Sequence, residues 1–131
     1  MAEEKLLAAD ALIGAAQWAS AYYLAGYAIE CGLKSCILAY VEASGAIFED
    51  KKYSEKCWTH NFDVLVDLAG LKPDLGVATA ATPALGANWA IASQWSEAAR
   101  YKMNTQPEAR TLYNAINDPV SGVMQWIRAH W

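Results

Sequence analysis

Apolar residues recur at helical spacing along most of the chain, and no segment alternates apolar and polar residues for long. The clearest stripe contains Tyr22, Ala25, Gly26, Ile29, Gly32, Leu33, Cys36, Ile37 and Tyr40. The opposite side of the same segment is also mostly apolar, since it carries Leu24, Ala28, Cys31 and Leu38. A helix that is apolar all round belongs at the centre of a bundle. The pattern therefore predicts an all-α protein built around one central helix.

The same periodicity predicts the other helices and the connections between them. The expected helices include residues 3–16, 18–43, 84–101 and 105–131. A further, shorter helix is capped by Thr59 or Asn61 and ends at Gly70. Residues 44–58 are polar, and residues 71–83 hold proline and glycine among small residues, so both segments are expected to be connections.

Capping and breaking residues define the last helix. Thr105 and Glu108 have the spacing of a capping box, which opens the helix. The apolar stripe stays in phase across Asp118 and Pro119, so we expect a kink or a capped restart there and no change of direction. The expected architecture is an antiparallel up-and-down bundle of four long helices plus a shorter one, in a single domain over residues 1–131.

Composition narrows the class of protein. The chain has 131 residues, is 55% hydrophobic and carries a net charge of −4, which suits one domain with a real core. No basic stretch indicates a DNA-binding surface, and RNA binding stays open without being favoured. The N-terminus begins acidic, unlike a secretory signal, and the apolar run 11–29 contains Gln17 and Ser20, which favours a core over a membrane span.

Cysteine and histidine usage points to a cytoplasmic protein without a metal site. The three cysteines, Cys31, Cys36 and Cys57, are an odd number, and two of them lie in the apolar central segment. Free thiols in a reducing compartment are therefore expected. No cysteine pair has zinc-finger spacing, and two histidines cannot complete such a site, so no metal or cofactor is expected.

Glu30 and Lys34 form a charged pair inside the apolar central helix. They are four residues apart, and Tyr23 and Tyr27 continue their row. Because a charge inside a buried helix is costly unless it is paired or used, this row is the first candidate for a functional site. Two interpretations stay open: a salt bridge across one helical turn, or a contact with a ligand or a dimer partner.

Three motifs in order resemble the HEPN family, a group of all-α domains that includes small prokaryotic members. They are AYYLAGYAIECGLKSCIL at 21–38, THNFDVLVDLAGL at 59–71 and WSEAARY at 95–101. They match the family's tyrosine-rich helix with A-x-E-x-x-L-K, its histidine before an apolar pair, and its closing Arg-Tyr. The resemblance implies a ligand-binding set of Tyr23, Tyr27, Glu30, Lys34, His60, Arg100 and Tyr101.

The resemblance also implies a bundle that often forms homodimers. Trp126 and Trp131, near the C-terminus, would suit such an interface if exposed. Many members are ribonucleases of toxin–antitoxin systems, some paired with a minimal nucleotidyltransferase as antitoxin, and others bind nucleotides or proteins without catalysis. Catalytic members carry an arginine followed closely by a histidine, which supply a cation and a proton-transfer group. Here Arg100 is followed by YKMNTQPEA, and Arg110 by TLYNAINDP, without histidine.

The expected function is therefore a non-catalytic homodimer that binds a partner protein or a small phosphorylated or nucleotide ligand. No catalytic residue is assigned in this interpretation. The alternative is a ribonuclease toxin with a rearranged site that uses His60 and Arg100.

Overall fold

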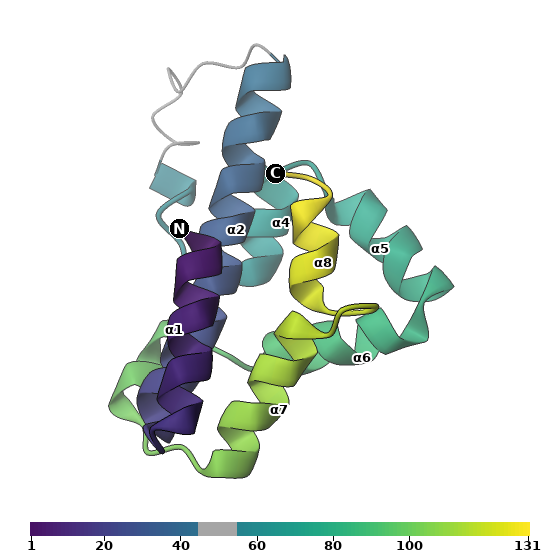
Figure 1. The fold of residues 1–131 in the computed structure, drawn as a ribbon. Helices are drawn as coiled ribbons and strands as arrows, with labels where there is room; N and C mark the ends of the chain where they lie inside the picture. The colour runs from purple at the N-terminus through teal and green to yellow at the C-terminus, as the bar shows by residue number, and fades with distance from the viewer. Residues whose placement is uncertain (45–54) are drawn as a thin grey trace.

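The computed structural model describes residues 1–44 and 55–131, apart from the side chain of Arg100. Of these residues, 76% are helical and none lies in a strand, which confirms the all-α class. With the labels of Figure 1, the elements are α1 (Ala2–Gly14), α2 (Trp18–Ser44), α4 (Phe62–Leu68), α5 (Lys72–Ala81), α6 (Pro83–Ala92), the 3-10 helix η1 (Glu97–Tyr101), α7 (Gln106–Asn117) and α8 (Val123–Arg128).

Helix α2 is the centre of the molecule, as its sequence predicts. It contacts α1, α4, α7, α8 and η1, and Figure 1 shows α1 lying along it. Its buried residues are Ala21, Ala25, Gly26, Ala28, Ile29, Glu30, Gly32, Leu33, Cys36, Ile37 and Val41. In the described part of the chain α2 alone is long and apolar enough to cross a membrane, but 56% of its most apolar stretch is buried by the other helices. It is packed here as a core helix.

The two ends of the chain are joined by an ion pair between α8 and α1. The Arg128 Nη2 atom donates to Glu3 Oε2 at 2.8 Å, and this hydrogen bond lowers the pKa of the Glu3 carboxyl. In the core below, the Cys36 thiol donates to the carbonyl of Ile127 at 3.7 Å. Burial raises the pKa of Cys36 to about 11, so this thiol stays protonated at neutral pH. All three cysteines are free, as expected.

The expected loop over residues 71–83 is wrong. This segment forms α5 and the start of α6, and Figure 1 shows α5 projecting from the body of the molecule while α6 returns toward α7 and α8. The prolines that suggested a loop lie in the first turns of these helices, where the missing N–H has no intrahelical partner to lose. Between the two helices Thr82, before Pro83, leaves helical geometry, with φ −126° and ψ 88°.

The expected single helix over residues 84–101 is also wrong, although its buried face is right. The helix ends at Ala92, and η1 begins at Glu97 after a short break. The apolar positions of the expected stripe still point inward on both sides of the break: Leu85, Ala92, Trp95 and Ala99 are buried.

The last segment restarts as expected, but its stripe is interrupted. Thr105 accepts a hydrogen bond from the Glu108 N–H, which confirms the capping box. Between α7 and α8 the Asp118 carboxylate accepts from the N–H groups of Val120 and Ser121 at 2.8 and 2.9 Å, which lowers its pKa. The apolar period across Asp118 and Pro119 predicts an inward Val120, but this residue is 85% exposed in the turn.

These breaks change the helix count. The expected set of four long helices and one shorter one is wrong, because α1, α2 and α7 have 13, 27 and 12 residues and the other described helices have ten or fewer. The expected caps of α4 are confirmed, since Asn61 accepts from the Val64 N–H and Gly70 has φ +71°.

Gly26 lets Trp95 pack directly onto α2. A Cβ atom at Gly26 would lie 2.3 Å from three atoms of the Trp95 ring. The ring also stacks on Phe62, with centroids 5.3 Å apart and planes 2° apart. Because Gly26 has no side chain, Trp95 and the segment before η1 can lie close to the central helix, and the stacking on Phe62 keeps the start of α4 there as well.

We expect Gly26→Ala to destabilise the protein by about 1–3 kcal/mol, because the added methyl group overlaps the Trp95 ring. The matched control is Gly76→Ala in α5, where an added Cβ meets no atom within 4 Å and helix propensity favours alanine by about 0.5–1 kcal/mol. Urea denaturation monitored by circular dichroism measures both. Equal midpoints for the two variants would contradict the packing described here.

Candidate functional site

Helix α2 holds the carboxylate of Glu30 inside the protein. Glu30 is 1% exposed and is the one polar or charged residue among the buried side chains described. Lys34, one turn later, places its Nζ 2.7 Å from Glu30 Oε1. The expected salt bridge is therefore present, but its two ends differ in exposure. Lys34 reaches water, whereas the Glu30 carboxylate is removed from water, so its burial is costly unless other groups also bind it.

The second partner of Glu30 is His60, which comes from the turn before α4. Its Nδ1 lies 2.8 Å from each carboxylate oxygen of Glu30. The turn is fixed locally, because the Asn61 N–H donates to Thr59 Oγ1 at 3.1 Å and Asn61 in turn caps α4. The sequence left open whether His60 faces the polar residues of the central helix, and the structure places it there.

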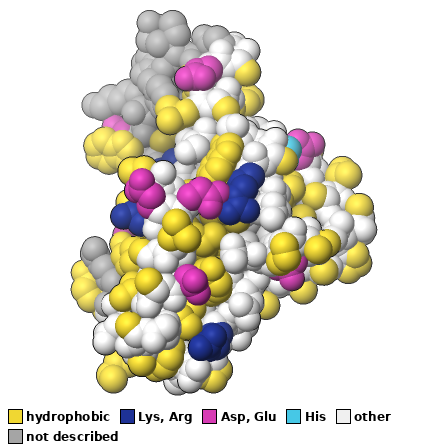
Figure 2. Space-filling model, in the orientation of Figure 1, with side chains coloured by type: hydrophobic (Ala, Val, Ile, Leu, Met, Phe, Trp, Pro, Cys, Tyr) yellow, Lys and Arg dark blue, Asp and Glu magenta, His cyan; other side chains and the backbone are white. Residues whose placement is uncertain are grey.

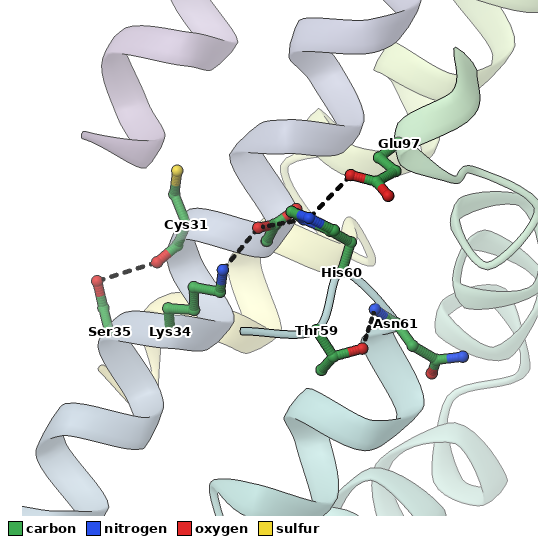
Figure 3. Close-up of polar contacts among 8 residues, drawn as sticks. Cys31, Lys34, Ser35, Thr59, His60, Asn61 and Glu97 are labelled. Carbon is green, nitrogen blue, oxygen red and sulfur yellow. Dashed lines mark hydrogen bonds and ion pairs between the residues drawn. The ribbon is translucent and has the colours of Figure 1, made fainter. Parts of the chain in front are cut away.

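Glu97 completes the arrangement from the other side of the ring. The Nε2 of His60 lies 2.8 Å from Glu97 Oε2, at the start of η1 (Figure 3). Glu30, His60 and Glu97 thus form a carboxylate–imidazole–carboxylate row, which we call the histidine bridge. It connects α2, the turn before α4 and η1, which are far apart in sequence. The protonated imidazole has two N–H donors and can serve both carboxylates, whereas the neutral ring has one.

A cleft of about 360 Å³ opens beside the histidine bridge. It is lined by Thr59, His60, Asn61, Phe62, Asp63, Ser93, Trp95, Ser96 and Glu97. One part of the lining is aromatic, and the rest presents hydroxyls, an amide, the imidazole and two carboxylates. The indole N–H of Trp95 is buried and has no hydrogen-bond partner among the described residues.

The two tyrosines expected in the site lie beside it. Tyr23 stacks on Tyr27 with ring centroids 5.9 Å apart and also contacts Trp95 at 5.9 Å. Tyr27 lies farther along the row, where the Nζ of Lys5 is 5.7 Å from its ring centre. Neither tyrosine lines the cleft. They support the wall that Trp95 forms.

The Arg-Tyr motif is only partly placed. Tyr101 ends η1 and is 77% exposed, outside the lining of the cleft. The side chain of Arg100 lies outside the described residues. The structure therefore brings Glu30, Lys34 and His60 together and leaves Tyr101 apart.

Sequence reasoning missed Glu97 and Trp95. Both belong to WSEAARY, one of the three motifs behind the family resemblance, whose match to the family is its final Arg-Tyr. Glu97 lies two positions after Trp95, and nothing in the sequence separates it from the other acidic residues of the surface.

Both ring nitrogens of His60 are engaged in this structure, because each has a carboxylate oxygen at hydrogen-bond distance. Within residues 1–44 and 55–131, no group of three or more His, Cys, Asp or Glu side chains could hold a metal ion. None of the protein-family models, curated proteins or solved structures compared with this chain matches it.

We expect Glu30→Gln to lower the free energy of unfolding by about 1–3 kcal/mol, because it removes charge from hydrogen bonds that His60 and Lys34 make to a buried group. Glu42→Gln makes the same chemical change at an exposed position of the same helix and should shift stability by less than about 0.5 kcal/mol. Thermal and urea unfolding compare the two. If Glu30→Gln were as stable as Glu42→Gln, the buried carboxylate would have no structural role.

Proposed function

We propose that this chain is a non-catalytic HEPN-like domain that acts as a homodimer and binds a partner protein at the cleft beside the histidine bridge. The observation that carries the proposal is the engagement of both His60 ring nitrogens by carboxylates. A general base needs a nitrogen that can reach the proton it removes. A histidine held on both sides serves instead to fix the shape of a surface.

The placement of the three motifs supports the HEPN-like assignment. The tyrosine-rich motif lies on α2, the histidine motif opens α4, and the third runs into η1. Glu30, His60 and Glu97, one from each motif, meet in the histidine bridge. We further propose the antiparallel arrangement, the single domain and the cytoplasmic location that the sequence suggested. A minimal nucleotidyltransferase stays the expected partner if the gene belongs to a toxin–antitoxin pair.

The charges of the cleft favour a protein over a phosphorylated ligand. Among the described side chains that line it, Asp63 and Glu97 are carboxylates. A phosphate group in this cleft would be repelled by both. Lys34 is turned toward Glu30 and does not line the cleft. Hydrogen-bond donors of a partner chain, including basic side chains, suit the carboxylates and hydroxyls that are present.

Purified protein should not cleave RNA above background at neutral pH in the presence of EDTA, because neither Arg100 nor Arg110 is closely followed by a histidine and the cleft carboxylates of Asp63 and Glu97 repel the RNA backbone. Gel assays on structured and single-stranded RNA test this, with a commercial ribonuclease as positive control. His60→Ala and Arg100→Ala preparations control for contamination. Cleavage by the wild type that both variants abolish would replace this proposal with the rearranged-site toxin.

We expect a two-fold homodimer in solution that buries more than about 1,000 Å². Trp126 is half-buried against Trp89, with ring centroids 6.1 Å apart, so the exposed tryptophans of the described residues are Trp58 at 76% exposure and Trp131 at 42%. The projecting α5, on the right of Figure 2, is covered mainly by hydrophobic and uncharged side chains. Light scattering at micromolar concentration measures the mass, and a monomer throughout would refute the dimer.

A further inference from the structure

We propose that the histidine bridge is a protonation-dependent latch that holds η1, one wall of the cleft, against α2. The latch is closed while His60 is an imidazolium and loosens when the ring loses a proton. The latch would regulate the cleft that the proposed function identifies as the partner-binding site, so its regulatory role rests on that proposed function. Its molecular behaviour can be measured without any partner.

Counting donors shows why one proton matters. The two ring nitrogens face carboxylate oxygens at 2.8 Å on either side, from Glu30 and from Glu97. Carboxylates accept hydrogen bonds and cannot donate them when ionised. Only the imidazolium form satisfies both contacts. In the neutral ring one nitrogen presents a lone pair to a negatively charged oxygen, and that contact becomes repulsive.

Burial decides which of the two contacts is lost. Glu30 is almost completely buried, so water cannot replace a missing donor there. The side chain of Glu97 is 52% exposed and can be solvated when it separates from the ring. The neutral ring therefore keeps its proton on Nδ1, toward Glu30, and releases Glu97.

Charged groups near the ring act in the same direction from each element. From α2, Lys34 also binds Glu30 and helps to hold this carboxylate in place. From α4, Asp63 shares the cleft with Glu97 and adds a second negative charge on that side. From η1, Glu97 itself is the group released; the side chain of Arg100, on the same short helix, lies outside the described residues.

The element that the latch holds is weak by itself. A 3-10 helix has poorer hydrogen-bond geometry than an α-helix and rarely runs beyond a few residues. Two described contacts link η1 to the centre of the protein: the burial of Ala99 and the contact of Glu97 with His60. When Glu97 is released, the wall gains freedom, and the cleft loses its positive charge while keeping two carboxylates.

Backbone amide exchange measured by NMR tests the latch directly. The N–H groups of Ala99 and Lys102 donate to Ser96 and Ala99 carbonyls at 3.0 and 3.1 Å, and their exchange reports on η1. Between about pH 5 and about pH 9, the range that brackets histidine titration, their protection factors should fall about two- to fivefold after correction for intrinsic exchange. The Ala21 amide, bonded to the Gln17 carbonyl, should not change and controls for global opening.

Glu97→Gln is the decisive variant. A glutamine can accept from the imidazolium through its oxygen or donate to the neutral ring through its amide, so η1 stays held in both states. Protection of Ala99 and Lys102 in this variant should be independent of pH. Flat protection in the wild type, or an equal loss in Glu97→Gln, would overturn the latch. RNA cleavage or a monomeric state would refute the proposed function and leave this result standing.

Discussion

A single buried carboxylate constrains much of this fold. Glu30 lies on α2, which α1, α4, α7, α8 and η1 contact, and its carboxylate is buried inside the protein, where a bare charge would be too costly to keep. Lys34, on the same helix, and His60, in the turn before α4, both bind this carboxylate. The chain after α2 must therefore return to the level of Glu30 before α4 can begin. The cap at Asn61 and the turn before it follow from this requirement.

The polar and apolar halves of the site depend on each other. Trp95 can stack on Phe62 only because Gly26 leaves room on α2, and this stacking brings the chain to Glu97 at the height of His60. The stacking of Trp95 on Phe62 thus positions Glu97 for its contact with His60. The cleft is the space that remains in front of both, which explains why its lining comes from the starts of α4 and η1.

Helix faces could be predicted from the sequence because burial follows the apolar period whether or not the helix is continuous. Trp95 and Ala99 are buried as the stripe requires, although the helix breaks before them. The break after Ala92 depends on tertiary contacts, which the apolar period does not report. The helices in residues 71–83 were hidden because the period does not reveal that their prolines lie in first helical turns. Glu30, Lys34 and His60 could be nominated from their types, but Glu97 could not be separated from other surface acids without distances.

The order of the chain has a consequence for its synthesis. Helix α2 is covered in part by α8, where Ile127 lies over Gly32 and accepts the Cys36 thiol hydrogen across 91 residues of sequence. At a translation rate of about 5–20 residues per second, this apolar helix leaves the ribosome about 5–20 s before its cover exists. During that interval it has the length and hydropathy of a membrane span. The nascent chain therefore exposes this apolar face until the last helix is made and can cover it.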